Sequence, residues 1–286
     1  MKQIAILSGK GGTGKTSITA SLAFLINNKI LVDCDVDAPD LHIILEPEIL
    51  RREEFKGRYE FKILPEKCTS CNKCYEVCRF NAIIKTGNKY TIDEYECDSC
   101  GFCFRVCPEK AIIKREKVSG EWFISNTRAG KFIYARLYPG EENTGKLVTL
   151  IRYMAKREAE DEKREYILID GPPGMGCPVI STLAGVDLVI AVTEPTLSGL
   201  SDLKRLLKTA DHFEVKSKVI INKYNINKEV SHKIENFCNE NGYEVVARIP
   251  FDSVFMEAMI NRKSVIEYAP SSEASKILTK IAREIQ

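Results

Sequence analysis

A short glycine-rich run near the start of the sequence constrains the fold of this chain more than any other feature. Residues Gly9–Thr16 read Gly-Lys-Gly-Gly-Thr-Gly-Lys-Thr and match the phosphate-binding pattern G-x-x-x-x-G-K-[ST]. The run follows an apolar segment, Ile4–Leu7, and precedes a helix-forming segment, Lys15–Asn27. In a strand–loop–helix arrangement, backbone N–H groups and the helix N-terminus can surround phosphates. The motif therefore predicts an α/β fold that binds a nucleotide.

Both ends of the chain alternate apolar, β-branched runs with helix-forming segments. Runs this apolar suit strands that are covered on both faces, and their alternation with helices predicts a doubly wound α/β fold with a mostly parallel sheet. The further expected strands are Ile30–Val32, Tyr166–Ile169, Leu188–Val192, Lys218–Ile221 and Glu244–Ile249, with a hairpin at Trp122–Ser125 and Phe132–Leu137. The further expected helices are Ser198–Asp211, Glu229–Asn241 and Ser272–Ile285.

The middle of the chain holds eight of the 11 cysteines, between Cys68 and Cys107. They form two copies of the spacing C-x2-C-x2-C-x3-C, which is the spacing of bacterial ferredoxins. In such a pair, three cysteines of one copy and the last cysteine of the other hold one cluster. The expected ligands are Cys68, Cys71, Cys74 and Cys107 for one [4Fe-4S] cluster, and Cys97, Cys100, Cys103 and Cys78 for the other. Structural zinc is the alternative, but zinc sites usually pair C-x2-C units across a wide gap.

The cysteine-rich segment interrupts the α/β pattern and predicts two domains. We expect residues 61–115 to form an inserted α+β domain like a two-cluster ferredoxin, and residues 1–60 and 116–286 to form the nucleotide-binding domain. Two cysteines outside the repeats, Cys177 and Cys238, are expected to pack as small apolar side chains, and the alternative for Cys177 is a place at a dimer interface.

Composition and charge restrict the kinds of molecule that the chain is expected to bind and the compartment in which it is expected to be found. The net charge of +2 gives no reason to expect nucleic acid or an anionic membrane as a partner. There is no apolar run of 18 residues, and the first apolar stretch is too short for a signal peptide, so we expect a cytoplasmic protein. In the cytoplasm such cysteines usually bind metal rather than form disulfides.

The phosphate loop assigns roles to consecutive residues. Lys15 should reach the β- and γ-phosphates, and the Thr16 hydroxyl should bind Mg²⁺. Asp170 ends an apolar strand and has the position of a Walker B aspartate, which would hold Mg²⁺ through water. The expected nucleotide contacts in the loop are Gly11, Gly12, Thr13, Gly14, Lys15, Thr16 and Ser17.

The loop carries an additional lysine, Lys10, and in this it resembles the deviant Walker A loop of the MinD, ParA and nitrogenase iron protein superfamily. The resemblance implies an ATPase that forms a homodimer in its ATP state, with Lys10 reaching the partner's nucleotide. It implies that Asp35 orients the attacking water and contacts the Mg²⁺ shell, with Asp37 as the second choice. Asp33 is expected to be structural. Catalysis is thus assigned to Lys10, Lys15 and Asp35.

Two weaker matches concern the base of the nucleotide. Asn222 ends a late predicted strand, where the family places an asparagine on the adenine, and Pro250 lies in a segment that resembles the loop closing over the base. The alternative explanation is a turn asparagine and an ordinary proline-containing loop.

Three functions remain open for such a chain. The first, which we prefer, couples ATP to electron transfer through the clusters to a redox partner, because the insert lies between the Asp35 and Asp170 motifs. The second is assembly of an iron–sulfur or other metallocofactor, although the late C-x-x-C of Mrp-type carriers is missing. The third is a ParA/MinD-like spatial organiser in which the clusters act as a redox sensor.

Overall fold

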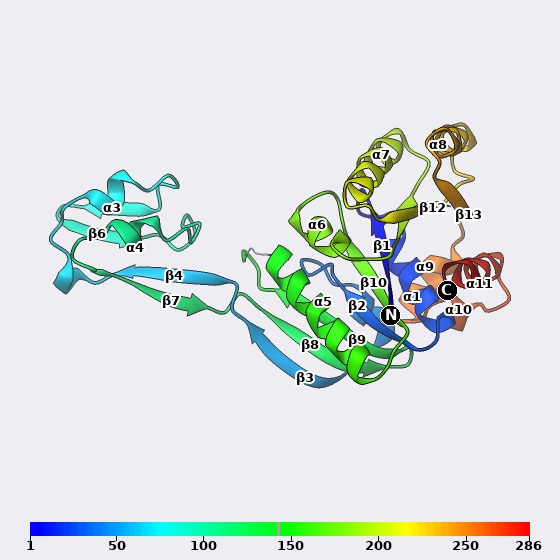
Figure 1. Ribbon diagram of the computed structural model, residues 1–286, viewed down its shortest axis with the longest axis horizontal. Helices are drawn as coiled ribbons and strands as arrows, with labels where there is room; N and C mark the ends of the chain where they lie inside the picture. The colour runs from blue at the N-terminus through cyan, green and yellow to red at the C-terminus, as the bar shows by residue number, and fades with distance from the viewer. Residues whose placement is uncertain (142–143) are drawn as a thin grey trace. The chain divides into compact units, whose positions relative to one another are not determined.

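The computed structural model describes residues 1–141 and 144–286, which divide into two compact units (Figure 1). The large unit comprises Met1–Glu53, Glu121–Leu137 and Thr144–Gln286. The small unit comprises Glu54–Gly120 together with a short segment that begins at Tyr138. It contains the segment 61–115, in which an inserted domain was predicted, and extends beyond it at both ends.

A nine-stranded sheet forms the centre of the large unit, with the strand order β13-β12-β11-β1-β10-β2-β9-β8-β3. The pairs from β13 to β9 are all parallel, as the alternation of strands and helices predicted. Six of the strands are β1 (Lys2–Ser8), β2 (Lys29–Asp33), β10 (Tyr166–Pro173), β11 (Leu188–Thr193), β12 (Lys216–Asn222) and β13 (Glu244–Ile249). The prediction of a mostly parallel α/β sheet is therefore confirmed.

Three further strands extend the sheet beyond β2. They are β9 (Gly130–Leu137), β8 (Gly120–Thr127) and β3 (Glu48–Phe55). The hairpin predicted in this region is the pair β8 and β9. The edge strand β3 was not predicted, because nearly all its residues are exposed and many are charged. Charged side chains on an edge strand oppose pairing with another molecule.

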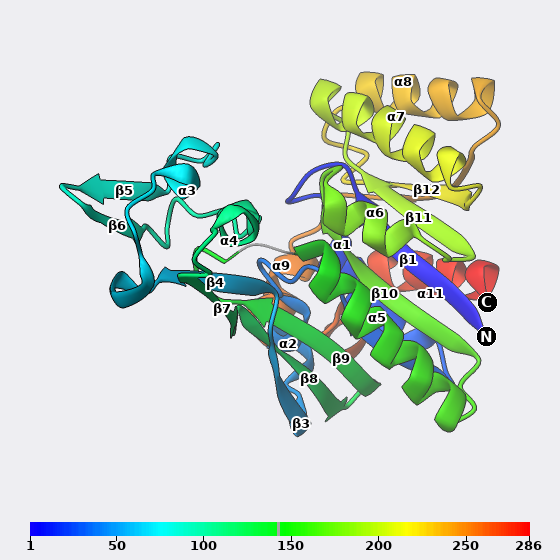
Figure 2. The same ribbon diagram turned by 60° about the vertical axis from the view of Figure 1, so that its left-hand side comes forward.

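Helices cover both faces of the sheet (Figures 1 and 2). On one face α1 packs with α11, and their buried side chains form one core with Ile4 and Ile6 of β1. On the other face α5 packs with α6. The helices are α1 (Lys15–Leu25), α2 (Leu41–Leu45), α5 (Thr144–Asp161), α6 (Cys177–Leu183), α7 (Leu197–His212), α8 (Lys228–Glu240), α9 (Val254–Ile260), α10 (Val265–Tyr268) and α11 (Glu273–Ile285). Within the described part of the chain, none is both long and apolar enough to cross a membrane.

The small unit consists of two antiparallel strand pairs and short helices. Strand β4 (Arg58–Ile63) pairs with β7 (Ile112–Lys117), and β5 (Ile83–Thr86) pairs with β6 (Lys89–Ile92). Besides the 3₁₀ turn Pro65–Lys67, it has the helices α3 (Lys73–Glu76) and α4 (Phe102–Val106). The core of the unit is small, with Phe61, Ile63, Ile83, Tyr90 and Ile112 surrounded by cysteines.

The backbone of the small unit repeats as its sequence does. Residues with positive φ occur in pairs at equivalent places of the two cysteine motifs, 29 positions apart (70 to 99, 72 to 101, 81 to 110). These pairs are Ser70 with Ser99, Asn72 with Gly101, and Asn81 with Lys110. The two motifs therefore share a local conformation as well as a spacing.

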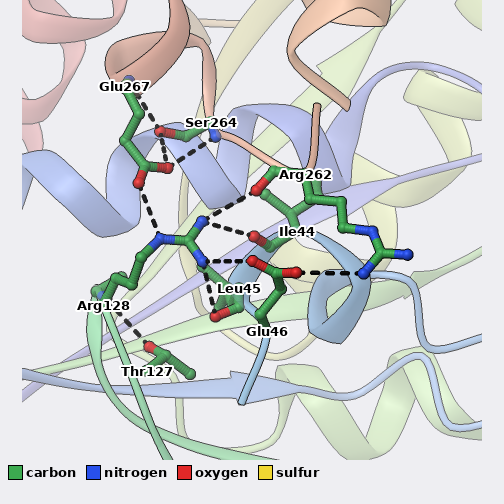
Figure 3. A network of polar contacts seen from close by, with 9 residues as sticks. Ile44, Leu45, Glu46, Thr127, Arg128, Arg262, Ser264 and Glu267 are labelled. Carbon is green, nitrogen blue, oxygen red and sulfur yellow. Dashed lines mark hydrogen bonds and ion pairs between the residues drawn. The ribbon is translucent and has the colours of Figure 1, made fainter. Parts of the chain in front are cut away.

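An arginine in the turn between β8 and β9 connects three parts of the large unit (Figure 3). Arg128 Nη2 donates to the Ile44 carbonyl at 2.9 Å and to the Arg262 carbonyl at 3.0 Å. Arg128 also pairs with Glu46 at 3.2 Å and with Glu267 at 3.0 Å. A cation at the last carbonyls of a helix is favourable, so Arg128 fixes the C-terminal end of α2 against the segment before α10.

Candidate functional site

The phosphate loop connects the end of β1 with the start of α1. Gly12 and Gly14 have φ angles of 79° and 88°, in the left-handed region that favours glycine. A Cβ atom on Gly14 would lie 2.4 Å from Asn222 Nδ2, so this position also needs glycine for space. The first turn of α1 contains no acidic residue, which leaves the positive end of the helix free to attract phosphate.

The structure brings Lys15, Thr16 and Asp170 together. Lys15 Nζ lies 3.0 Å from Asp170 Oδ1, and Thr16 Oγ1 donates to Asp170 Oδ2 at 2.8 Å. Thr19 Oγ1, which the sequence interpretation did not include, donates to Asp170 Oδ1 at 2.8 Å. Burial alone would lower the pKa of Lys15, but the carboxylates of Asp170 and Asp33 raise it. The three predicted groups for phosphate and Mg²⁺ thus form one polar cluster, in which Lys15 and Asp170 are buried and Thr16 is partly exposed.

The three aspartates after β2 differ in their surroundings. Asp33 is fully buried and accepts the backbone N–H groups of Asp35 at 3.0 Å and Leu41 at 3.3 Å, which gives it a structural part in the turn before α2. Burial raises the pKa of Asp35 to about 6, although the nearby Lys15 ammonium lowers it. Asp37 is exposed. Of the three, Asp35 combines partial exposure with the electrostatic influence of Lys15.

The two residues predicted to lie near the base lie at the same edge of the sheet, Asn222 as the last residue of β12 and Pro250 in the loop after β13. Asn222, which is buried, donates from Nδ2 to the Thr13 carbonyl at 2.7 Å and so supports the phosphate loop. Pro250 follows β13, and the next residue, Phe251, donates its backbone N–H to Asn225 Oδ1 at 2.7 Å. The loops that follow β12 and β13 are therefore tied to each other.

Two further residues of the predicted phosphate loop, Gly11 and Ser17, lie in different surroundings. Gly11 is exposed, and a Cβ atom placed on it would meet nothing within 4 Å. Ser17 lies in α1, where its carbonyl accepts the Ser21 hydroxyl at 2.8 Å.

Lys10 is engaged within its own chain. Its Nζ lies 2.7 Å from Glu194 Oε1 and donates to Thr196 Oγ1 at 3.0 Å. Glu194 Oε2 also pairs with Lys223 Nζ at 3.0 Å. The sequence interpretation missed Glu194 and Lys223, although both directly follow strands, β11 and β12, at the carboxyl edge where parallel sheets bind ligands.

The eight clustered cysteines line two separate pockets of the small unit. One pocket is lined by Cys68, Cys71, Cys74 and Cys107, and the other by Cys78, Cys97, Cys100 and Cys103. These are the two sets that the ferredoxin spacing assigned to separate clusters. The Ala111 backbone N–H donates to Cys107 Sγ at 3.3 Å.

All the cysteines are free thiols in the structure. Within residues 1–141 and 144–286, no group of three or more His, Cys, Asp or Glu side chains is arranged to hold a single metal ion. Outside the repeats, Cys238 is buried as predicted. The expectation that Cys177 packs in the core is wrong, because this residue is exposed at the start of α6.

Comparison with known sequences places the chain among nucleotide-binding proteins. The profile of the CobQ/CobB/MinD/ParA nucleotide binding domain matches residues 4–265. An uncharacterized protein of Methanocaldococcus jannaschii is 42% identical over 231 residues, which cover 79% of this chain and 79% of the relative. An uncharacterized ATP-binding protein of the same organism is 24% identical over 294 residues, which cover 99% of this chain and 98% of that protein.

Solved structures show the same fold. The septum site-determining protein MinD of Pyrococcus horikoshii, complexed with Mg-ADP, matches with a TM-score of 0.59 and 18% identity. The match covers 100% of this chain and 96% of that protein. The predicted MinD/ParA type of fold is confirmed.

Proposed function

The chain belongs to the CobQ/CobB/MinD/ParA family of nucleotide-binding domains and is a P-loop ATPase, and we propose that it is a MinD/ParA-like switch whose small unit carries two [4Fe-4S] clusters. The observation that carries the proposal is the division of eight cysteines into two pockets of four. In this account ATP controls whether two copies of the chain associate, and the clusters make the switch responsive to electrons.

The ATP site is assigned by the groups that already contact one another. Lys15 and Thr16 both bind Asp170, so a phosphate that attracts Lys15 would release Asp170 oxygens. Thr16 and Asp170 would then hold Mg²⁺ and its water molecules. Asp35 would orient the attacking water, and Lys10 would reach the nucleotide of a partner subunit. Asn222 would reach the adenine, and Pro250 would belong to the loop that closes over it.

The cysteine pockets fit four-iron clusters better than single ions. A [4Fe-4S] cluster takes one thiolate per iron, so its ligands stand farther apart than the ligands of one zinc ion. Positive φ angles at Ser70 and Asn72, repeated at Ser99 and Gly101, are typical of backbone nests that hold anions, including iron–sulfur clusters. Bound clusters would supply one-electron chemistry.

Two outputs are compatible with such a switch. The likeness to a septum site-determining MinD favours control of position, with the clusters as a redox sensor. The two pockets of four cysteines favour transfer of electrons to a protein partner. ATP-dependent sedimentation with DNA or with anionic lipid vesicles would support control of position. If neither DNA nor vesicles are bound in any nucleotide state, electron transfer becomes the preferred output.

The cluster assignment is tested by iron and sulfide analysis of anaerobically purified protein. We expect about eight irons per chain, and about four in the Cys71→Ser or Cys100→Ser variant, since each change removes one ligand of one cluster. Cys177→Ser is the matched control, because this exposed cysteine lies outside both pockets, and it should keep all the iron. A chain that binds zinc in place of iron and sulfide would refute the assignment.

The switch itself is tested by sedimentation velocity. With Mg²⁺ and a non-hydrolysable ATP analogue the chain should sediment as a dimer, and with ADP as a monomer. Lys10→Gln should bind the analogue but remain monomeric. Identical sedimentation in all nucleotide states would contradict the proposal.

A further inference from the structure

We propose that Glu194 is a positioning residue that holds Lys10 within its own subunit and so sets the threshold for ATP-dependent dimerisation. The inference rests on the proposed function, because the proposed function requires Lys10 to reach a partner's nucleotide. It adds a residue, Glu194, and a restraint to that function.

The contacts of Lys10 define the restraint. Its ammonium lies 2.7 Å from Glu194 Oε1 and donates to Thr196 Oγ1 at 3.0 Å and to Ser198 Oγ at 3.2 Å. The side chains of Lys10 and Glu194 are only 27% and 17% exposed, so water screens this ion pair less than an ordinary surface pair. An ammonium with these three oxygen partners is not free to bind a phosphate in another subunit.

Apart from Glu194, the surroundings of Lys10 disfavour a cation. Thr196 is the N-cap of α7 and accepts the Gly199 N–H at 2.9 Å, so Lys10 lies at the positive end of a 16-residue helix. Lys223 brings a second ammonium to the same carboxylate. Burial would raise the pKa of Glu194, but its bonds with both lysines lower it, and the carboxylate stays ionised. Neutralising Glu194 would therefore leave Lys10 next to positive charge with two hydroxyl partners.

The carboxylate and a nucleotide phosphate compete for the same ammonium. A phosphate carries more negative charge than a carboxylate, so it can displace Glu194 once a second subunit presents it. The Lys10–Glu194 pair must break in both subunits of a dimer, and its free energy opposes association twice. Lys223 also donates to the Gly12 carbonyl at 2.9 Å, which connects Glu194 with the loop that binds the subunit's own nucleotide.

The test is sedimentation equilibrium of the full chain with Mg²⁺ and a non-hydrolysable ATP analogue. Glu194→Gln should dimerise at a roughly tenfold lower protein concentration than the unmodified chain, because two ion pairs no longer oppose association. Lys223→Gln is the matched control: it leaves Lys10 as the remaining lysine on Glu194 and should not strengthen dimerisation. Lys10→Gln should abolish the effect of Glu194→Gln in the double variant.

Each outcome decides one of the two claims. If the unmodified chain dimerises and Glu194→Gln, with analogue binding intact, does so no more tightly, the restraint is refuted while the proposed switch stands. If the unmodified chain and Glu194→Gln both stay monomeric with bound analogue, the proposed switch is wrong and the restraint falls with it. If Glu194→Gln no longer binds the analogue, Ser198→Ala decides: tighter dimerisation supports the restraint, and unchanged dimerisation refutes it.

Discussion

At the scale of single residues, Asp35 gives a prediction about pH. Burial raises its pKa to about 6, so the carboxyl group becomes protonated as the pH falls through 6. A protonated Asp35 cannot orient water as a carboxylate does. We expect kcat/KM for ATP hydrolysis to fall about tenfold for each pH unit below 6, because kcat/KM reports ionisations of the free enzyme. A steady-state assay between pH 5 and pH 8 measures this decrease in kcat/KM.

The control separates Asp35 from its neighbour Asp33, whose pKa is also raised by burial. Asp35→Asn should lower the activity at least ~100-fold and remove the acid limb. Asp33→Asn should keep the fall of kcat/KM below pH 6. If this fall disappears in Asp33→Asn, the pH dependence belongs to Asp33. The free energy of unfolding should change in the opposite direction to the activity. Above pH 6 the ionised Asp35 destabilises the folded state, because its pKa of about 6 is higher than the 3.8 of the unfolded chain. This destabilisation disappears as the pH falls from 6 toward 3.8.

A second prediction at this scale concerns Arg58, which supports one cysteine loop of the small unit. Arg58 Nη2 donates to the Cys97 carbonyl at 2.5 Å, and Nε donates to Ser99 Oγ at 3.3 Å. Removing this cation from the vicinity of one proposed cluster, in Arg58→Gln, should lower the reduction potential of that cluster by roughly 40 mV, because the cation favours the more negative, reduced form. The measurement is a potentiometric titration followed by EPR.

The second cluster provides the internal control. Its ligands include Cys68 and Cys71 in the other pocket, so its potential should stay unchanged in Arg58→Gln. Equal shifts of both clusters, or no shift in either, would show that Arg58 does not act on the Cys97 loop alone.

Residue identity explains how much of the site could be predicted from the sequence. Lys15 and Asp170 each belong to a recognisable motif and contact each other in the large unit. The two regularly spaced sets of cysteines each line one pocket of the small unit. Glu194 and Lys223 could not be paired in this way, because their contact depends on two parallel strands that end at the same level. The contact of Lys10 with Glu194 of its own chain depends on the same geometry, because Glu194 follows one of these strands.

At the scale of elements, the Arg128 network makes a prediction about stability (Figure 3). Arg128→Ala removes the donor of the Ile44 and Arg262 carbonyls and the partner of Glu267. Because Arg128 is partly exposed, we expect a loss of only about 1–2 kcal/mol in the free energy of unfolding. Urea denaturation of the large unit measures it.

Arg262→Ala is the matched control for this network. It removes only the exposed pair with Glu46 and keeps the backbone carbonyl that Arg128 binds, so the loss should stay below about 0.5 kcal/mol. Equal losses in the two variants would mean that the carbonyl contacts of Arg128 do not stabilise α2.

The small unit gives the next prediction at this scale, which concerns removal of iron. Its core contains five buried residues, and six cysteines pack against it, so the apolar area alone is small. We expect a chelator under reducing conditions to abolish amide protection in residues 58–117, while the large unit keeps its protection and its ATP binding. Hydrogen exchange with mass spectrometry distinguishes the units. Unchanged protection of residues 58–117 after loss of iron would contradict the assignment of the cysteines as cluster ligands.

The elements that could be predicted from the sequence are those with a clear hydrophobic pattern, either a continuous apolar run or a helical period. The parallel strands are apolar throughout because helices cover them on both faces. Helix α5 was not predicted over its full length, although Leu147, Ile151 and Ala155 are buried at helical spacing, because its first turn contains Gly145 and its last turns are rich in charged residues. The edge strand β3 lacks an inward face and shows no alternation.

At the scale of the whole molecule, the chain leaves the large unit after β3 and returns to it at β8, the strand next to β3 in the sheet. Strands β3 and β8 are adjacent at the edge of the sheet, and the small unit lies between them in the sequence. An insertion at neighbouring strand ends leaves the parallel sheet and its phosphate loop intact. This explains how a P-loop ATPase can carry a second unit without losing the family fold.

The central claim is that the nucleotide switch and the proposed clusters belong to one mechanism. The most direct test is a potentiometric EPR titration of anaerobically purified protein without nucleotide, with ADP, and with a non-hydrolysable ATP analogue. The account predicts two [4Fe-4S] signals, at least one of which changes its potential or line shape with the analogue. Two clusters with identical spectra and potentials in all three states, in a chain that still dimerises with the analogue, would contradict the claim.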